Sequence, residues 1–358
     1  MVQPLLLNMT RRKFIEKSIY GGAGLAAFSL TGSSLYASAR AEVINPAFAK
    51  LLDGISPTET RYGGTVAVWF SSHYQVDQRD WTNIQEFGND YHPLAGYYKS
   101  DDPAILKKQL HWMRRAGIDA IVYDVFSTGV WNLTDLPKDK TLQLLLKELA
   151  DPQSEAHHFK LIIWLEKYCS TPTPEEYEYA FAYIKEHLAN REFYFHYEGK
   201  PLVVPYLNAA LGDLDDTLEK YRAEFAIRYI RAEKSDFWSY INHSPQQIRK
   251  GWICASPGMD SYLEDAHISR HVNHQTSPPL GEIRARAQRM PRQNGTTFVR
   301  QLQLAKQNNP EIIFVSGWND WQYGCQIEPA LEYRFFYLDL TSKVLGRWAE
   351  TAAFRDEK

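Results

Sequence analysis

The stretch Ser100–Phe126 reads SDDPAILKKQLHWMRRAGIDAIVYDVF and joins a helical pattern directly to a continuous apolar run. Its acidic, proline-containing start is typical of the first turn of a helix. Leu106, Leu110 and Met113 share one face of that helix, and Gly117 is a residue type that often ends one. The apolar run that follows lacks alternating polar residues, which is typical of a parallel strand covered on both faces. The stretch therefore predicts one helix–strand unit of a parallel sheet.

The same combination recurs along the chain. Further apolar runs are interpreted as strands, the last being the weakest: Thr65–Phe70, Lys160–Glu166, Pro201–Leu207, Phe225–Ile230, Gly251–Gly258, Glu311–Trp318 and Arg334–Leu340. Helical patterns lie between them, among them 173–188, which opens with capping-box spacing, and 295–308. About eight such repeats predict an α/β fold, a single-domain (β/α)8 TIM barrel. An open doubly wound sheet is the alternative, but its glycine-rich turn after the first strand is absent, since Gly63 and Gly64 precede that strand.

The composition is that of a globular protein without a nucleic-acid or membrane bias. The chain has 358 residues, of which 44% are hydrophobic and 23% charged, and its formal net charge is -3. The chain has no excess of basic residues. Its composition therefore does not indicate binding to nucleic acid or to an anionic membrane. Aromatic residues make up 14% of the chain, with 10 Trp and 22 Tyr. Rings in this abundance serve either core packing or stacking on flat ligand faces.

The first 39 residues resemble an export signal. Arg11 and Arg12 precede an apolar stretch rich in small residues, and Ala37-Ser38-Ala39 has the pattern of a signal-peptidase site. The paired arginines predict a twin-arginine signal peptide over 1–39 and a periplasmic or secreted domain over 40–358. The alternative is an N-terminal membrane anchor, but the apolar stretch is short for a spanning helix. No stable membrane insertion is expected after cleavage.

The cysteines give no sign of a metal centre. Cys169, Cys254 and Cys325 are odd in number and show no CxxC spacing, so we predict no zinc site. No other feature of the sequence requires a metal or a cofactor. One disulfide among the three is compatible with the count.

Polar residues follow most of the predicted strands. In a (β/α)8 barrel the functional site lies at the carboxyl ends of the strands. The residues at or just beyond those ends are His73, Tyr74, Asp124, Glu166, Tyr206, Asp260, Trp318, Asn319, Asp320 and Trp321. Several carboxylates would therefore meet at one barrel mouth, among aromatic rings. The polar stretch 269–295 is predicted to be a long loop on the same face.

This combination favours chemistry on sugars. Cleavage of a glycosidic bond needs a proton donor for the leaving oxygen and a second carboxylate as nucleophile or base. Trp and Tyr rings stack on the apolar faces of sugar rings. The alternative for each carboxylate is a structural ion pair or hydrogen bond inside the barrel mouth. The joint position of Glu166 and Asp320 at predicted strand ends favours the functional interpretation.

Several stretches resemble the glycoside hydrolases of families 99 and 71. The stretch from His92 to Phe126, which begins HPLAGYYKS, resembles their GYY-x-S-x-DP … A-GIDG opening. The stretch GKPLVVPY is similar to their fourth strand. CASPGMD is similar to their SPG-[YF]-D segment. VSGWNDWQYGCQIEPA (Val315–Ala330) is similar to their S-[WF]-NEW-x-EGT-x-IEP signature. The resemblance covers Thr65 to Ala330.

The resemblance implies a (β/α)8 barrel that acts on α-linked glycans. In family 99, which contains endo-α-mannosidases, it implies retaining hydrolysis through a sugar epoxide. One signature Glu deprotonates the sugar 2-hydroxyl, and a second acts as general acid and then general base. By position the first Glu falls on Asp320 and the second on Tyr323. A further family Glu at the end of the third strand falls on Glu166.

Two positions depart from the family pattern. Asp320 keeps the charge but is one methylene shorter, and a misplacement of about 1 Å can cost roughly a hundredfold in rate. Tyr323 replaces a carboxyl by a phenol, whose ordinary pKa near 10 makes it a poor acid at neutral pH. The acid can instead come from Glu166, Asp124 or Asp260. Glu328 lies well past the strand end and is interpreted mainly as structural.

The sequence thus predicts an exported glycosidase with an oligosaccharide or polysaccharide substrate. Its predicted catalytic carboxylates are Asp320 and Glu166. Its predicted substrate contacts are Trp318, Asn319, Trp321, Tyr323, His73, Tyr74, Asp124, Tyr206, Asp260 and Glu328. One alternative is a non-catalytic carbohydrate-binding barrel, because the second signature Glu is missing. The other is a polysaccharide lyase, in which Tyr323 or a histidine abstracts a proton.

Overall fold

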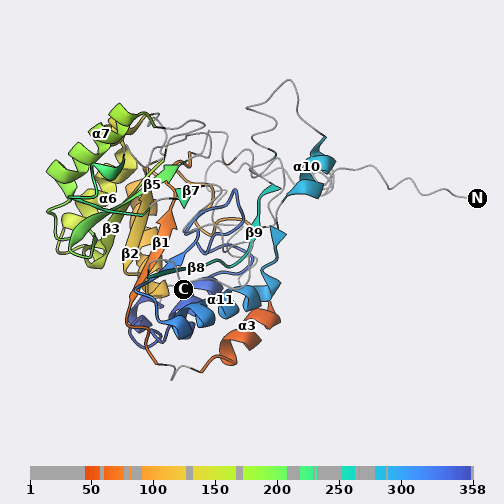
Figure 1. The fold of residues 1–358 in the computed structure, drawn as a ribbon. Coiled ribbons are helices and arrows are strands. Elements are labelled where there is room, and N and C mark those ends of the chain that lie inside the picture. The colour runs from red at the N-terminus through yellow and green to blue at the C-terminus, as the bar shows by residue number, and fades with distance from the viewer. Residues whose placement is uncertain are drawn as a thin grey trace, which may run out of the picture. The chain divides into compact units, whose positions relative to one another are not determined.

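A computed structural model provides the structure of the chain (Figure 1). It describes residues 45–56, 60–75, 81, 91–125, 132–166, 172–207, 218–228, 230–231, 251–262, 266, 279–287 and 289–355. The predicted signal peptide, 1–39, lies outside the described residues. Ile44–Lys358 form one compact unit. No helix within the described ranges has the length and apolar character needed to span a membrane.

The strands alternate with helices along most of the chain. The strands are β1 (Thr65–Phe70), β2 (Ala120–Asp124), β3 (Lys160–Leu165), β4 (His196–Tyr197), β5 (Lys200–Leu207), β6 (Ala226–Ile227), β7 (Ile230–Arg231), β8 (Trp252–Ala255), β9 (Met259–Asp260), β10 (Arg289–Met290) and β11 (Ile312–Val315). The α-helices are α3 (Pro46–Asp53), α5 (Pro103–Ala116), α6 (Lys140–Ala150), α7 (Pro174–Tyr183), α10 (Leu280–Arg286), α11 (Thr296–Asn308) and α12 (Phe336–Val344). Short 3-10 helices cover Leu133–Lys138, Glu155–His158, Gln293–Gly295 and Ala352–Phe354, and a π-helical turn covers Ile184–Leu188.

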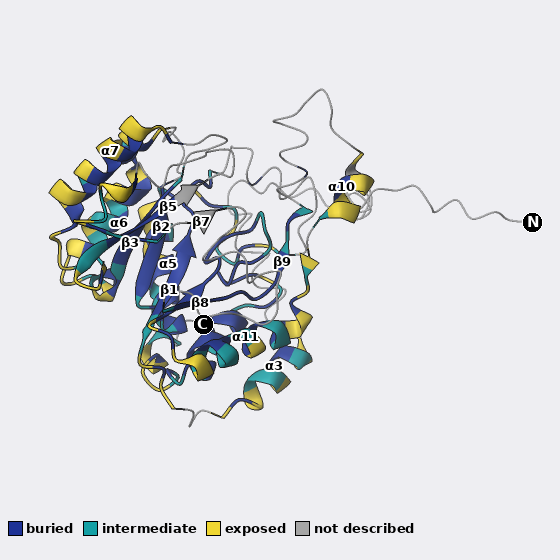
Figure 2. Cartoon of the chain, viewed as in Figure 1, coloured by how far each residue is buried: buried dark blue, intermediate teal, exposed yellow. Residues whose placement is uncertain are grey.

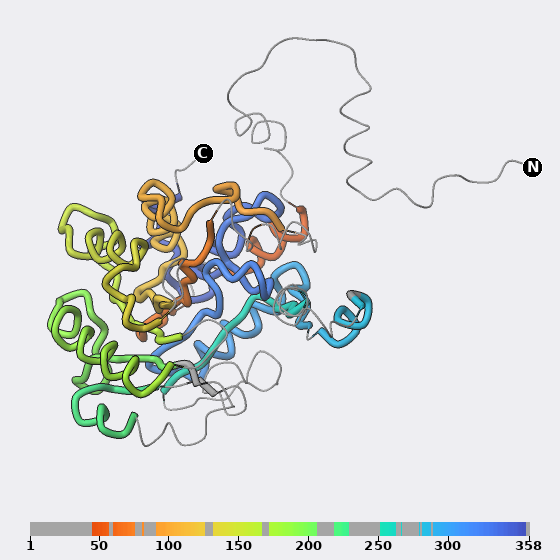
Figure 3. The backbone as a smooth tube through the Cα atoms, turned by 90° about the horizontal axis from the view of Figure 1, so that it is seen from above, coloured from red at the N-terminus to blue at the C-terminus, as the bar shows by residue number. Residues whose placement is uncertain are grey.

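The main sheet is mostly parallel and brings the two ends of the described chain together. Its strand order is β4-β5-β3-β2-β1-β11-β8, with β6 and β7 both pairing with β5. Only β4 runs antiparallel among these described strands. β1 lies between β2 and β11, so the first and last strands are neighbours. In Figure 3 the successive units follow one another from orange through green to blue around the view.

The helix and strand ends follow the sequence signals that predicted them. The Asp102 side chain caps α5 by accepting the Ala104 N–H at 2.8 Å. Gly117 ends this helix at φ 74°, a left-handed conformation that glycine adopts without strain. A capping box formed by Thr173 and Glu176 begins α7.

Two predictions about secondary structure are wrong. Residues 334–340 were predicted to be the eighth strand, but 336–340 are the first residues of helix α12, which packs against α3, α5 and α11. β11 pairs directly with β1, so no strand lies between them. The stretch 269–295, predicted to be a loop, contains α10 and also β10, which pairs with β9. Its residues 269–278 lie outside the described part.

The strands β1, β2, β3, β5, β8 and β11 bury residues on both faces, as the continuous apolar runs predicted (Figure 2). One face packs against helices and includes Val66, Val68, Ile121, Ile163, Val203, Ile253 and Ile313. The opposite face contains no helix residue among its buried members and is formed by Ala67, Trp69, Ala120, Val122, Ile162, Trp164, Leu202, Val204, Trp252, Cys254, Ile312 and Phe314. We call this second set the inner face.

Candidate active site

Strand alternation places polar residues at the carboxyl end of the inner face. Because side chains alternate between the two faces, the next inner position after Val122 is Asp124, and the next after Trp164 is Glu166. β2 and β3 are neighbours with Asp124 opposite Trp164. The two carboxyl-bearing residues therefore lie on adjacent strands at the same end of the sheet.

Aromatic rings form the layer directly beneath these carboxylates. The centroids of Trp69 and Trp164 are 6.1 Å apart in an edge-on arrangement. The ring of Phe314 stacks against Trp164 at 6.4 Å. Trp69 and Trp164 were not among the predicted site residues. The period-two patterns Ala67-Trp69-Ser71 and Ile162-Trp164-Glu166 carry the signal that places them on the inner face.

Asp320 reaches this end of the sheet from the segment that follows β11. The chain turns at Gly317, whose φ is 86°, and a side chain there would meet the Cys325 carbonyl oxygen at 2.8 Å. The Asp320 carboxylate is buried and accepts two hydrogen bonds. Its Oδ1 accepts the Tyr323 backbone N–H at 3.2 Å, and its Oδ2 accepts the Cys325 thiol at 3.0 Å. Burial raises the pKa of Asp320 to about 6, although both donors favour the ionised form.

Glu166 is held by the ring beneath it. Its Oε2 accepts the Trp164 indole N–H at 3.0 Å. Burial, followed by the negative charge of Asp320, raises the pKa of Glu166 to about 7, against the effect of the indole hydrogen bond. Asp320 therefore lies close enough to Glu166 for its charge to oppose the ionisation of Glu166, and the catalytic role of the two carboxylates stays a prediction.

Asp124 is the third carboxylate of the site. It is 2% exposed, and its Oδ1 has no hydrogen-bond partner among the described residues. Burial is the main cause that raises its pKa well above the ordinary value. The charges of Glu166, Asp320 and Asp139 act in the same direction.

Asn319 fixes the segment after β11 to the end of β1. Its Oδ1 accepts the Ser71 N–H at 2.8 Å, and its Nδ2 donates to the Ser71 carbonyl at 2.7 Å. The amide also donates to the Tyr98 hydroxyl at 3.2 Å. This side chain is fully buried and positions Asp320, the next residue, relative to β1.

Glu328 lies in a buried hydrogen-bond cluster. Its carboxylate accepts the Tyr98 hydroxyl at 2.9 Å, the Gln109 amide at 2.9 Å and the Trp321 indole at 2.8 Å. Burial raises the pKa of Glu328 to about 7 despite these three donors. The cluster ties the β11 segment to α5, which carries Gln109.

The rings predicted to line the substrate site are buried in this structure. Trp318, Trp321 and Tyr74 have no exposed surface. The Tyr74 hydroxyl donates to the Asn319 carbonyl at 2.8 Å and accepts the Trp321 N–H at 3.2 Å. His73 is 9% exposed, stacks on Tyr74 and bonds to the Ser71 hydroxyl through Nδ1. In this arrangement the rings are packed in the core and hold the backbone next to Asp320. Their contact with substrate stays a prediction.

The other predicted site residues lie at the rim or outside the described side chains. Tyr323 is partly exposed, and its backbone carbonyl accepts the Asp260 N–H at 2.7 Å. Asp260 forms ion pairs with Arg284 at 2.8 Å and Arg289 at 3.2 Å. The side chain of Tyr206 lies outside the described part of the structure, although its backbone belongs to β5.

The described residues contain no group of three or more His, Cys, Asp and Glu side chains arranged to hold a metal ion. Cys254 and Cys325 are buried. Cys169 lies outside the described residues.

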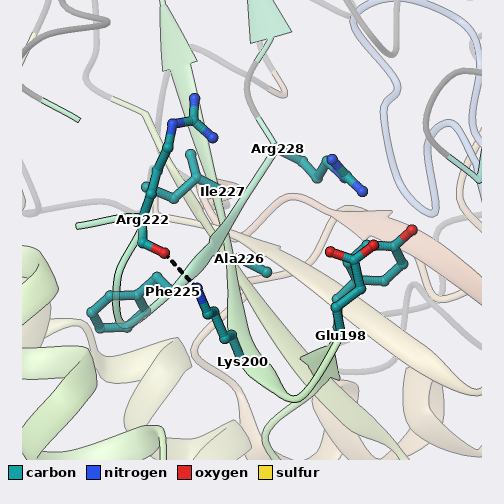
Figure 4. Close-up of a pocket in the computed structure, with 8 residues that line it drawn as sticks. Glu198, Lys200, Arg222, Phe225, Ala226, Ile227 and Arg228 are labelled. Atoms are coloured by element: carbon teal, nitrogen blue, oxygen red, sulfur yellow. Dashed lines mark hydrogen bonds between the residues drawn. The ribbon is translucent and has the colours of Figure 1, made fainter. Parts of the chain in front are cut away.

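A cavity of about 190 Å³ lies at the opposite end of the sheet (Figure 4). It is found where β5 and β6 begin, next to Lys200, Arg222 and Arg228. Lys200 donates to the Arg222 carbonyl at 2.7 Å, and the Arg222 side chain pairs with Glu219 at 2.8 Å. The Arg228 guanidinium lies 4.6 Å from the Tyr197 ring centroid. These cations already have protein partners, and strand polarity separates them from the carboxylates.

The fold is similar to that of solved glycoside hydrolases. An endo-α-mannosidase of family 99 from Bacteroides thetaiotaomicron, in complex with bis-tris propane, is 15% identical, with a TM-score of 0.54, over 81% of this chain and 98% of its own. A second structure of a family 99 endo-α-mannosidase from the same organism is 14% identical, with a TM-score of 0.53, over 80% and 98%. A glycoside hydrolase-like protein is 13% identical, with a TM-score of 0.52, over 81% and 96%. No family model and no curated protein matches the sequence. The likeness shows a shared fold.

Proposed function

We propose that this chain is an exported glycoside hydrolase that cleaves an α-linked oligosaccharide or polysaccharide. The observation that carries the proposal is the pair of carboxylates Asp320 and Glu166, which have pKa values raised to about 6 and about 7. Both lie at the carboxyl end of a parallel sheet, and the fold is similar to that of family 99 endo-α-mannosidases. Carboxyl groups with pKa values near neutrality suit general acid–base catalysis at physiological pH.

The hydrogen bonds of Asp320 support a role as base or charge stabiliser. Two donors hold both of its oxygens, so the carboxylate has one orientation and is favoured in its ionised form. Glu166 has one donor and partial exposure. In this proposal Glu166 stabilises the positive charge that develops at the anomeric carbon, and Asp320 accepts a proton from a sugar hydroxyl or from water.

Closure of the sheet into a barrel and export are parts of the same proposal. Closure requires a contact between the edge of the sheet at β6 and β7 and the other edge at β8. Support comes from the direct β1–β11 pairing and from the shared fold. The paired Arg11 and Arg12 before an apolar stretch support export. Mass spectrometry of the periplasmic fraction would show a mature N-terminus near residue 40, whereas an uncleaved cytoplasmic chain would contradict export.

The enzymatic proposal is tested with a substrate screen and two matched variants. Purified protein is incubated with α-mannan, α-glucan and acidic polysaccharides, and the products are followed by NMR. Asp320→Asn and Glu166→Gln are each expected to lower turnover of the cleaved glycan by about a hundredfold or more. Asp135→Asn, which removes a carboxylate paired with the exposed Lys138 and not among the proposed catalytic residues, is the control and should retain activity. Full activity in both site variants would contradict the proposal.

One observation favours a second candidate, a carbohydrate-binding barrel without catalysis. Tyr323 occupies the position of the second signature Glu, and its backbone N–H and carbonyl are both used in holding the segment together. This candidate predicts calorimetric binding of a glycan with no product after long incubation. Activity gained in Tyr323→Glu would then indicate a barrel that lost its acid.

A further inference from the structure

Asp124 differs from the other buried carboxylates at the carboxyl end of the sheet. Asp320 accepts two hydrogen bonds, Glu328 accepts three and Glu166 accepts one. Within the described residues, no donor reaches Oδ1 of Asp124, although the residue is 2% exposed. A buried carboxylate oxygen without a donor is costly to ionise, so this environment favours the neutral carboxyl group.

The position of Asp124 brings it to the two proposed catalytic carboxylates. It is the last residue of β2 and continues the inner face beyond Val122. The neighbouring strand β3 supplies Glu166, and the segment after β11 supplies Asp320. Their charges act on Asp124, together with that of Asp139 just before α6, and all three oppose its ionisation.

The other two candidates for the missing acid are less suited to hold a proton. Asp260 already forms ion pairs with Arg284 and Arg289, so its carboxyl oxygens have protein partners. Glu166 accepts the Trp164 indole N–H, which also favours its ionised form. Asp139, by contrast, is used structurally, since it accepts the Tyr123 hydroxyl and the Leu142 N–H.

We propose that Asp124 is the general acid of this site. It supplies the proton that Tyr323, at the position of the second signature Glu, is poorly suited to donate. The inference rests on the proposed glycosidase function. The Asp124 carboxyl group gives its proton to the glycosidic oxygen while the bond from that oxygen to the anomeric carbon breaks, with the electron pair moving to the oxygen. A water molecule then forms the new bond to the anomeric carbon and gives its proton to the Asp320 carboxylate. Proton exchange through solvent returns Asp124 to the acid form and Asp320 to the base form.

Leaving groups of different acidity test this role. A poor leaving group needs a proton from the enzyme, whereas 2,4-dinitrophenolate leaves without one. The probes are methyl and 2,4-dinitrophenyl α-glycosides of mannose, glucose and their α-linked disaccharides. Asp124→Asn is expected to lose about a hundredfold or more on the methyl glycosides and less than about tenfold on the dinitrophenyl glycosides. Both probes are measured on one preparation, so a lower folded fraction would reduce the two rates alike.

Two control variants sharpen the comparison. Asp135→Asn should leave both rates unchanged, because Asp135 pairs with the exposed Lys138 and is not one of the proposed catalytic carboxylates. Tyr323→Phe should leave the ratio of the two rates unchanged. A leaving-group dependence in Tyr323→Phe but not in Asp124→Asn would overturn the inference. An equal loss on both probes in Asp124→Asn would overturn it as well. Cleavage of neither probe nor glycan by the wild-type chain would instead remove the proposed function.

Infrared spectroscopy supplies a readout that does not need a substrate. At neutral pH the neutral-acid carbonyl band of the wild-type chain should lose intensity in Asp124→Asn and keep it in Asp135→Asn, whereas Glu166 and Glu328 contribute to the band in all three proteins. A wild-type spectrum that lacks the neutral-acid band assigned by this comparison would overturn the inference even if the chain hydrolyses glycans.

Discussion

Cys325 donates its thiol hydrogen to Oδ2 of Asp320 across 3.0 Å. Both residues are buried, and the Ser316 hydroxyl lies 3.9 Å from the same sulfur. The thiol therefore orients a carboxylate rather than serving as a reactive group, because burial and the neighbouring Asp320 charge hold the pKa of Cys325 well above its ordinary value. We expect Asp320 to depend on this contact for its position.

Replacement of Cys325 should change the titration of Asp320. Cys325→Ala removes a donor that favours the ionised carboxylate, so the pKa of Asp320 should rise and the acidic limb of the rate profile should move to higher pH. We expect kcat/KM near neutral pH to fall roughly tenfold. Cys325→Ser keeps a donor and should retain most of the activity. The pH dependence of kcat/KM for both variants measures the effect, and identical profiles for Ala and Ser would show that the thiol does not position Asp320.

Arg292 holds the segment that supplies both hydrogen bonds to Asp320. Its guanidinium donates to the Gly324 carbonyl at 3.0 Å and the Gln326 carbonyl at 2.7 Å. Three tyrosine rings surround the cation, with centroids at 4.9 Å for Tyr91, 5.6 Å for Tyr333 and 4.7 Å for Tyr337. This cage holds the backbone on both sides of Cys325.

Substitution of Arg292 should lower stability and activity together. Arg292→Lys keeps the charge but loses the planar group that reaches two carbonyls and stacks on rings, so we expect a loss of about 2–3 kcal/mol in the free energy of unfolding. kcat should fall more than the folded fraction does, because the donors to Asp320 lose their support. Denaturant unfolding and steady-state kinetics measure the two effects. Arg300→Lys on exposed α11 is the matched control, and equal behaviour of the two variants would argue against the cage.

The strands could be predicted because their apolar runs are buried on both faces. The same signal failed at 334–340, because an apolar run of that length also fits a buried helix. Phe336, Leu340 and Val344 follow a four-residue spacing and lie in the core between helices. The direct pairing of β1 with β11 is a long-range feature that no local pattern reports.

Site residues at the ends of strands could be predicted from the sequence. Residues whose positions depend on a reversal of the chain could not. Asp124 and Glu166 continue the inner alternation of their own strands, so position alone indicates them. The turn at Gly317 directs the rings of Trp318 and Trp321 into the core, which the sequence cannot distinguish from an exposed aromatic platform. Arg292 acts across more than thirty positions of sequence, and only the folded chain brings it to Gln326.

Glu328 should make the protein less stable as pH rises from acid to neutral. Burial raises the pKa of Glu328 from its ordinary 4.5 to about 7 in the folded chain. Between these values the folded state binds more protons than the unfolded state, so the stability from this group is complete below pH 4.5 and is lost as pH rises through about 7. A shift of this size corresponds to about 3 kcal/mol. Asp124, Glu166 and Asp320 have pKa values raised in the same direction and add to the trend.

Glu328→Gln isolates this contribution. The amide cannot ionise, so the variant should lack the part of the pH dependence that Glu328 supplies. The carboxylate of Glu328 accepts hydrogen bonds from Tyr98, Gln109 and Trp321, so the amide N–H₂ of the variant would face one of these donors with another donor. This should lower stability by about 1–3 kcal/mol at pH 4.5. Between acid and neutral pH the wild type should lose about 3 kcal/mol relative to the variant, so the variant becomes as stable as the wild type or more stable. Urea unfolding across this pH range measures it, and parallel curves for the two proteins would show that Glu328 stays ionised in the folded chain.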